Sequence, residues 1–450
     1  MDNSRFLKFD QTRKVLEHCD KEATGAIEIP DSVESIGDEA FSGCSGLMAI
    51  EIPNSVESIG RWAFSGCSGL TAIEIPDSVT SIGNRAFSGC SGLTAIEIPD
   101  SVESIGDEAF KGCSGLTAIE IPDSVTSIGY KAFDGCSGLT AVNVDTENEN
   151  YTSIDGVLYD KNKSAIVRYP SSHKGESFII PDSVTSVGSF AFDGCSGLTS
   201  ITIGNSVTSI EQGAFSGCSG LTSMTIPNSV KSIECMAFSF CSGLTLVTIP
   251  NSVKSIGWNA FSFCSGLTSM TIPNSVTSIE MRAFDGCSGL TEINVDTENK
   301  DYTSIDGVLY DKYKSTIVSY PSSHEGESFI IPNSVRSIGD CAFSGCSGLT
   351  SIEIPDSVTW IMSYAFSGCS GLTAIEIPDS VESIGDEAFS GCSGLTEIHI
   401  KLRDISTITD KSIFDGVCKE RCTLYVPIGK GYAYRHHPVF GDFPNIVLER

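Results

Sequence analysis

A five-residue motif, Ala-Phe-x-x-Cys, recurs thirteen times and constrains the fold more than any other feature of the chain. Within three blocks its cysteine returns every 23 residues, at Cys44, Cys67, Cys90, Cys113 and Cys136, then Cys195, Cys218, Cys241, Cys264 and Cys287, then Cys346, Cys369 and Cys392. A fixed period of about 20 to 50 residues is typical of a solenoid, in which each coil contacts only its neighbours. The 450 residues are therefore expected to form one repeat array rather than several globular domains.

The spacing inside one unit predicts how a coil is built. Ile73 and Ile75 alternate with period two, which is typical of a short strand with both side chains in the core. Pro76 lacks an N–H group and ends that strand, and the Asp-Ser or Asn-Ser that follows favours a turn. Val79-x-x-Ile82 predicts a second short extended segment, and Ala86-Phe87 a tight turn or a single helical turn.

Two stretches depart from the period in the same way, because Cys136 to Cys195 and Cys287 to Cys346 each span 59 residues. Both contain Tyr-Thr-Ser-Ile-Asp-Gly-Val-Leu-Tyr-Asp-Lys, and the two copies lie 151 residues apart. The segments 157–159 and 166–168 flank a polar turn, so the sequence predicts a β-hairpin. We expect hairpin inserts near 144–180 and 295–331 within a solenoid of residues 26–400, an N-terminal cap of residues 1–25 and a C-terminal cap of residues 401–450.

The unit Leu-x-x-Ile-x-Ile-Pro-x-x-Val-x-x-Ile-Gly-x-x-Ala-Phe-x-x-Cys resembles the leucine-rich repeat of the BspA (Treponema pallidum-type) family. The inserts and the tail Leu424-Tyr425-Val426-Pro427 resemble segments of the same family, so the likeness covers nearly the whole chain. The resemblance implies a right-handed, β-rich superhelix with a concave parallel sheet and short turns or helical turns on the convex side. It also implies a surface or secreted protein that binds host or microbial partners.

Charge narrows the classes of partner. The chain has 57 acidic and 28 basic residues and a net charge of -29. Such a surface repels nucleic acid and anionic lipid and attracts basic partners. No apolar run is long enough to span a bilayer, so we expect no membrane insertion. We also expect the chain to be a monomer. The first ten residues contain no signal-peptide pattern, which leaves both a surface and a cytoplasmic location open.

The eighteen cysteines and six histidines match no zinc signature, and we expect no metal and no cofactor. The thirteen repeat cysteines are interpreted as a reduced, buried column, while Cys418 and Cys422 are either a disulfide or a free pair. In the inserts, Asp145-x-Glu147-Asn148-x-Asn150 carries oxygen ligands but lacks EF-hand spacing. Asx turns explain that motif with fewer assumptions.

Two surfaces are candidate binding sites. The residue between the two inward isoleucines should point outward, and in the first block this row reads Glu28, Glu51, Glu74, Glu97 and Glu120. A row of glutamates suits a basic segment or divalent cations. Duplication of one acidic repeat is favoured over a specific metal site, and a basic partner stays open. The second candidate is the arc 190–285, where apolar and basic residues replace the repeat's usual ones at Phe190, Met236, Leu246, Trp258, Met281, Lys231 and Lys254. Phe240 and Phe263 replace the glycine of Ser-Gly-Cys and are expected mainly to fill gaps between coils.

An enzyme is the alternative from another class. Catalysis requires a local, desolvated cluster of acids or a nucleophile with its base, whereas the acids here repeat with the fold. The prediction is therefore a non-catalytic interaction protein, adhesin-like, that recognises a protein or glycan. An intracellular structural scaffold without a dedicated ligand is the second hypothesis, and a glycan-active solenoid enzyme is the third.

Overall fold

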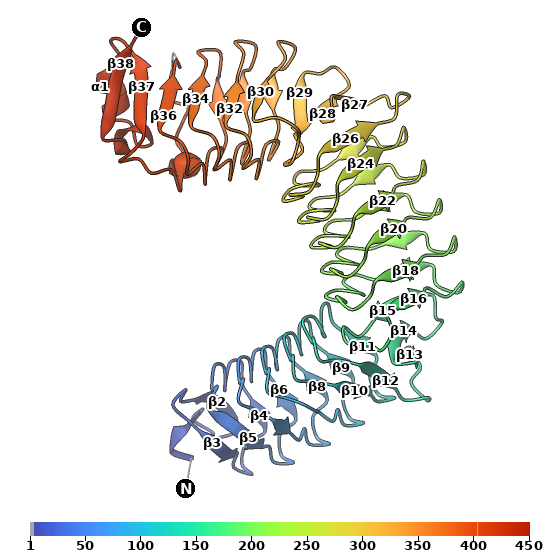
Figure 1. Cartoon of the computed structure of the whole chain (residues 1–450). Helices are drawn as coiled ribbons and strands as arrows, with labels where there is room; N and C mark the ends of the chain where they lie inside the picture. Colours follow the sequence, from blue (N-terminus) through green and yellow to red (C-terminus); the bar gives the residue numbers. More distant parts are fainter. Residues whose placement is uncertain (1–3, 403) are drawn as a thin grey trace. The chain divides into compact units, whose positions relative to one another are not determined.

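The computed structural model describes residues 4–402 and 404–450, so residues 1–3 of the expected N-terminal cap lie outside it. The described chain forms two compact units, divided between Leu221 and Thr222, and each is a β-solenoid of stacked coils. Most regular coils carry two short strands that pair with equivalent strands of neighbouring coils (Figure 1), and the coil with Ile96 has an isolated bridge at Glu97 in place of the first. The predicted solenoid with parallel strands is confirmed.

The first strand of a coil includes the first residue of the Ile-x-Ile segment or its equivalent, and its pairing is parallel and in register with the next coil. In the first unit these strands are β3 (Gly25–Glu28), β5 (Leu47–Glu51), β7 (Ala72–Ile73), β10 (Ala118–Ile121), β12 (Ala141–Val144), β16 (Ser177–Ile179) and β18 (Ser200–Thr202). In the second unit they are β20 (Ser223–Thr225), β22 (Leu246–Thr248), β24 (Ser269–Ile272), β26 (Glu292–Val295), β30 (Ser328–Ile330), β32 (Ser351–Glu353), β34 (Ala374–Ile377), β36 (Glu397–Ile400), β37 (Thr423–Pro427) and β38 (Asn445–Glu449).

The second strand of each coil contains the Ser-Ile pair and confirms the predicted second extended segment. In the first unit this row holds β2 (Val15–Cys19), β4 (Ser35–Ile36), β6 (Ser58–Ile59), β8 (Ser81–Ile82), β9 (Ser104–Ile105), β11 (Ser127–Ile128), β17 (Ser186–Val187) and β19 (Ser209–Ile210). In the second unit it holds β21 (Ser232–Ile233), β23 (Ser255–Ile256), β25 (Ser278–Ile279), β31 (Ser337–Ile338), β33 (Trp360–Ile361) and β35 (Ser383–Ile384).

The Ala-Phe segments form tight turns, not helices. In each of these turns the cysteine N–H bonds to the carbonyl oxygen of the phenylalanine three residues earlier, as Cys67 N does to Phe64 O at 3.1 Å. Within the described residues the only α-helix is α1 (Gly431–Arg435), and η1 (Ser4–Phe6), η2 (Lys411–Phe414) and η3 (Phe440–Asp442) are short 3-10 turns. Helical turns, the alternative expected for the repeat, therefore occur only near the chain ends.

Columns of identical side chains form the core. Phenylalanine rings of successive coils stack nearly parallel, for example Phe64 on Phe87 with centroids 5.1 Å apart. The repeat cysteines are fully buried, as predicted, and each thiol also has a polar role that the sequence did not indicate. Cys90 Sγ lies 3.1 Å from the carbonyl oxygen of Phe64, and most of the cysteine column repeats this contact one coil further on. The thiol thereby gains an acceptor in the core, and the carbonyl oxygen, which already accepts from the cysteine N–H of its own turn, takes a second hydrogen bond.

Each insert contains the predicted hairpin and one further strand. In the first unit β13 (Tyr151–Ile154), β14 (Val157–Asp160) and β15 (Ala165–Arg168) form an antiparallel meander, and β15 then pairs in parallel with β17. The second unit repeats this arrangement with β27 (Tyr302–Ile305), β28 (Val308–Asp311) and β29 (Thr316–Ser319). The last strand of each insert thus takes the place of a Ser-Ile strand, so the insert is a coil of the same solenoid.

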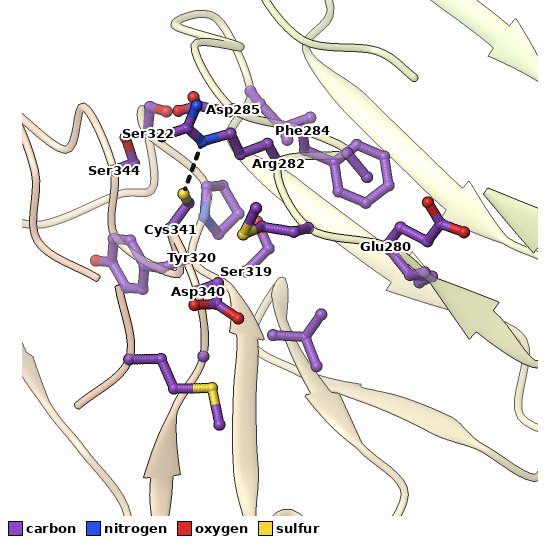
Figure 2. Close-up of a pocket in the computed structure, with 18 of the residues that line it drawn as sticks. Glu280, Arg282, Phe284, Asp285, Ser319, Tyr320, Ser322, Asp340, Cys341 and Ser344 are labelled. Atoms are coloured by element: carbon purple, nitrogen blue, oxygen red, sulfur yellow. Dashed lines mark hydrogen bonds between the residues drawn. The ribbon is translucent and has the colours of Figure 1, made fainter. Parts of the chain in front are cut away.

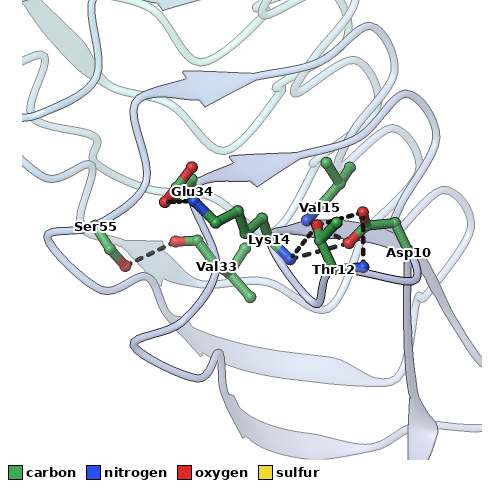
Figure 3. Close-up of polar contacts among 7 residues, drawn as sticks. All are labelled: Asp10, Thr12, Lys14, Val15, Val33, Glu34 and Ser55. Carbon is green, nitrogen blue, oxygen red and sulfur yellow. Dashed lines mark hydrogen bonds and ion pairs between the residues drawn. The ribbon is translucent and has the colours of Figure 1, made fainter.

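The N-terminal hairpin uses the same construction. Strand β1 (Leu7–Phe9) pairs antiparallel with β2, and β2 pairs in parallel with β4. In the turn between them Asp10 Oδ1 accepts hydrogen bonds from the N–H groups of Lys14 and Val15 (Figure 3). A hydrogen bond from the Thr12 hydroxyl, together with these N–H bonds, lowers the pKa of Asp10 to about 2. Lys14 also forms an ion pair with Glu34 at 2.6 Å, which links the hairpin to the first regular coil.

Candidate interaction surfaces

The glutamate row lies where the sequence predicted it. Strand pairing places Glu28 beside Glu51 and Glu74 beside Glu97, and all five side chains of the row are exposed. Neighbouring strands are about 4.8 Å apart, so the carboxylates form one continuous acidic line. A broad groove follows its first part, with Ala26 and Ala49 beside the glutamates.

No cation of the described residues neutralises this row. None of the five glutamates makes an ion pair or a side-chain hydrogen bond there, whereas Glu376, at the equivalent position of the second unit, is paired with Lys401. Unpaired like charges on adjacent strands are destabilising. The row is therefore an electrostatic feature that the fold does not compensate internally.

The residues predicted in the arc 190–285 belong to three different parts of the coil. Leu246 begins a first-row strand, and Lys231 and Lys254 come directly before second-row strands. Met236, Trp258 and Met281 lie in the turn that follows the second row. All are exposed except Met236, which is half-buried. The structure therefore does not bring this set together into one patch.

The structure corrects the prediction for Phe190. It was expected on the surface, but it is 3% exposed. Its ring lies against the backbone of Gly213 in the next coil, where an added Cβ would come within 2.2 Å of a ring carbon. Lys131 Nζ covers the ring at 3.6 Å from its centroid, so a residue of the same unit already occupies this aromatic face.

The structure also corrects the prediction for Phe240 and Phe263, in the opposite direction. They were expected mainly as fillers between coils, but they are 51% and 47% exposed. The two rings stack with centroids 4.8 Å apart and an interplanar angle of 5°. The Phe263 ring also lies over Gly286 of the following coil. We call these two residues the aromatic pair.

The backbone of the aromatic pair explains why glycine is usual at this position. Phe240 and Phe263 have φ of 60° and 57°, in the left-handed region, and the glycines at this position in the other regular coils also have positive φ. At Gly66 and Gly89 an added Cβ would meet only ordinary contacts, at 3.5 Å. Glycine is therefore used for its conformation and not for lack of space. Replacement of a glycine by a large side chain in Ser-Gly-Cys was the signal in the sequence.

The two inserts create a second kind of site, a cavity where each insert meets the coil before it. We call them the first seam, around Lys131, Arg168 and Phe190, and the second seam, around Arg282, Ser319 and Cys341. Their cavities measure about 290 Å³ and about 200 Å³. In the second seam Arg282 reaches across to Cys341, with Nε 3.3 Å from Sγ, and Ser322 and Ser344 lie close by (Figure 2).

Burial raises the pKa of two titratable groups near the seams, Cys341 and Asp193. Burial, opposed by Arg282, raises the pKa of Cys341 to about 11, so its thiol stays protonated at neutral pH. In the first unit burial and a hydrogen bond with Asp134 raise the pKa of Asp193. Arg168 lowers it again, but by less. No cluster of three or more metal-ligating side chains occurs among the described residues.

The acidic motif of the inserts forms Asx turns, as the sequence favoured. Asp145 Oδ1 accepts from Glu147 N at 2.8 Å, and Asn148 Oδ1 accepts from Asn150 N and Tyr151 N. Asn148 is fully buried, and its Nδ2 donates to Pro122 O and Val125 O of the preceding coil. These oxygen atoms are therefore occupied in local hydrogen bonds.

Within residues 4–402 and 404–450, no helix combines the length and apolarity that crossing a bilayer requires.

Comparison with known proteins identifies the repeat. The family description "BspA type Leucine rich repeat region" matches residues 17–140, 168–291 and 316–425, which is well over half of the chain. No curated protein matches the chain.

Similar solved structures are bacterial leucine-rich repeat proteins. A leucine rich cell surface protein of Faecalibacterium prausnitzii is 30% identical over 73% of this chain and 78% of its own, with a TM-score of 0.47. Leucine-rich repeat proteins of Bacteroides ovatus (26% identity, 99% and 98% coverage, TM-score 0.40) and Eubacterium ventriosum (25% identity, 85% and 91% coverage, TM-score 0.46) are also similar. By the extent of the family match, the chain belongs to the BspA-type leucine-rich repeat family.

Proposed function

We propose that this protein is a non-catalytic, adhesin-like interaction protein that binds a protein or glycan partner, with the aromatic pair as the centre of the contact. One observation carries the proposal. Phe240 and Phe263 expose about half of each ring at a corner that the other regular coils build with glycine, so the fold does not need the rings there. Exposed aromatic side chains are enriched among residues that contribute most to binding.

The neighbouring residues support a contact at this corner. Trp258 lies in the same corner as Phe263, and Met281 and Asp285 belong to the next coil. Phe263 N bonds to Asp285 O at 2.7 Å, which fixes the ring beside that coil. A partner that buries both rings would gain about 0.8 to 1.5 kcal/mol for each ring, since about half of each is already covered. Of the residues predicted from the sequence, Trp258 and Met281 stay in the proposed surface.

The glutamate row is proposed as a second, electrostatic part of the binding surface. Glu51, Glu74, Glu97 and Glu120 lack internal counter-ions and would attract basic segments of a partner. Leu246, Lys231, Lys254 and Met236 remain predictions without a common patch.

The test measures binding of the labelled full chain to an array of immobilised extracellular-matrix proteins and glycans. The F240G/F263G variant, which restores the residue of the other coils, should lose at least tenfold in affinity for the partner that wild type binds. The matched control is Met48→Thr, because Met48 is equally exposed and threonine stands at that position in the next coil. M48T should bind as wild type does.

Two results would contradict the proposal. If wild type binds no member of the array, the structural scaffold without a ligand becomes the better hypothesis. If a partner is bound equally by wild type and F240G/F263G, binding exists but the aromatic pair is not its centre.

A further inference from the structure

The two seams are copies of one another, which allows a residue-by-residue comparison. The inserts lie 151 residues apart, so Arg168, Ser171, Phe190 and Asp193 of the first seam correspond to Ser319, Ser322, Cys341 and Ser344 of the second. The strand pairing is also the same, since β15 pairs with β17 as β29 pairs with β31. Differences between the seams therefore arise from side chains on an equivalent backbone.

In the first seam a guanidinium group is buried and bound. Arg168 is 4% exposed. Its Nη1 donates to Phe190 O at 2.9 Å, and its Nη2 donates to Ser171 Oγ at 3.0 Å and Asp193 O at 3.2 Å. Three oxygen atoms of the seam thus form a receptor for the planar, five-donor guanidinium group.

In the second seam the receptor is present and the arginine is absent. Ser319 stands at the position of Arg168, and the equivalents of the three acceptor residues, Ser322, Cys341 and Ser344, all line the 200 Å³ cavity. The corresponding acceptors Ser322 Oγ and Ser344 O take no hydrogen bond from any described residue. Cys341 O accepts from Ser344 N, just as Phe190 O accepts from Asp193 N, so the backbone geometry is retained.

The first seam's cavity does not reach this receptor. Its walls include Arg168 and Phe190 but neither Ser171 nor Asp193, whose oxygen atoms are bound by the guanidinium group. The cavity of the second seam extends to Ser322 and Ser344. Loss of the arginine side chain has therefore opened the guanidinium receptor to the cavity.

Charge in the second seam favours a cation. Its walls carry Glu280, Asp285 and Asp340 against one cation, Arg282. Arg282 lies at the edge of the receptor, where its Nε bonds to the side-chain sulfur of Cys341 and its Cζ lies 4.3 Å from the centroid of the Tyr364 ring. It donates to neither Ser322 nor Ser344 (Figure 2). Met281 and Met362 add flexible apolar walls suited to an aliphatic stem.

We propose that the second seam binds the guanidinium group of an arginine side chain presented by a protein partner. The guanidinium would occupy the place that Arg168 fills in the first seam, bonding to Cys341 O, Ser322 Oγ and Ser344 O. The net negative charge of the chain favours the approach of such a partner. The two proposed sites share Met281 and Asp285, but the rings of Phe240 and Phe263 do not line this cavity, so F240G/F263G should retain arginine binding.

The experiment titrates the full chain with N-acetylarginine amide, and with N-acetylcitrulline amide as the uncharged isostere, observed by NMR. The arginine amide should bind in the millimolar range with one site per chain, and the citrulline amide at least tenfold more weakly. A short arginine-containing peptide should bind more tightly than free arginine, since the proposed source is a protein. Tighter binding of free arginine would overturn that source.

Three variants test the location. Ser319→Arg restores the residue of the first seam and should abolish binding, because the chain then fills its own receptor. Ser322→Ala, a smaller change in case S319R does not fold, should weaken binding at least threefold. If folded S319R or S322A binds as wild type does, the proposal is wrong. If only R282K binds arginine amide, the chain's own Arg282 is the occupant and the proposal is also wrong.

Discussion

Two positions in the turn of each coil have a positive φ, and this left-handed backbone conformation restricts which residues can occupy them. The first place, just before Ala-Phe, takes ordinary residues such as Glu39, Arg85 and Glu108, with φ near 55°. The second takes glycine except at Phe240 and Phe263. A left-handed residue with a Cβ costs about 1 to 2 kcal/mol, so the aromatic pair carries a conformational cost that its stacking only partly offsets.

Glycine should therefore be more stable than alanine at these two positions. We expect F240G and F263G each to exceed F240A and F263A in free energy of unfolding by about 1 kcal/mol, because only alanine retains the Cβ. Urea unfolding measures the difference. At the control position Thr245, which has no positive φ, the order should reverse; the same order at all three positions would refute the conformational explanation.

Asp193 gives a pH-dependent prediction. Its raised pKa means that the folded state holds the proton to higher pH than the unfolded state does, so the residue destabilises the fold increasingly as pH rises above 3.8 toward neutrality. Asp193→Ser, which copies Ser344 of the second unit, should therefore stabilise the chain by about 1 to 2 kcal/mol more at pH 8 than at pH 4. Denaturant midpoints at the two pH values measure this, and an equal gain at both would show that the proton is not involved.

Among the elements, a hairpin closed by an aspartate recurs three times, at Asp10, Asp160 and Asp311. In each, Oδ1 accepts from the N–H groups four and five residues later, which fixes the turn before the chain enters the second row of strands. The inserts add a second fixed point, because buried Asn148 and Asn299 each bond to two carbonyl oxygens of the preceding coil.

Asn148 should be among the most sensitive polar residues of the first unit. Asn148→Ala removes four hydrogen bonds, two to carbonyl oxygens and two from N–H groups, and we expect a loss of about 2 to 4 kcal/mol in the free energy of unfolding. The matched control is N150A, because Asn150 is exposed and makes no side-chain hydrogen bond. Thermal unfolding that ranks N150A at or below N148A would contradict this account.

The sequence was sufficient for the elements that obey the repeat. Its alternation of Ile73 and Ile75 and the returning Phe and Cys predicted both strand rows and the core, because every coil supplies the same evidence. It was insufficient where one residue's environment depends on a neighbouring coil. Phe190 is buried only because Gly213 of the next coil leaves room for its ring. Nothing local marks Arg168 as buried, and β13 has no apolar alternation to reveal it.

For the whole molecule, repulsion among the excess negative charges opposes the stabilising packing between coils. The same interface between successive coils, with a column of stacked phenylalanines and a column of cysteines, repeats along both units. A net charge of -29 on 450 residues adds self-repulsion that the few internal ion pairs leave largely unbalanced.

Salt should therefore stabilise the whole chain. Raising NaCl from about 10 mM to about 200 mM at pH 8 shortens the screening length from about 30 Å to about 7 Å, and we expect Tm to rise by several degrees. Near the isoelectric point of 4.4 the effect should disappear, because the net repulsion is then absent. A second monovalent salt distinguishes screening from specific ion binding. An equal rise at pH 4.4 and pH 8 would exclude charge repulsion as the cause.

The two inserts acquire a further meaning from the sameness of the other coils. Because the regular coils are nearly identical, the chain can misfold by one repeat. If one coil is skipped, the coils on either side of it can still pack together through an interface almost equal to the native one. An insert cannot be exchanged in this way, because its meander and its buried asparagine occur only once in each unit. The inserts therefore act as register marks: a slip that begins among regular coils stops at the next insert, so misalignment is limited to one block of the array.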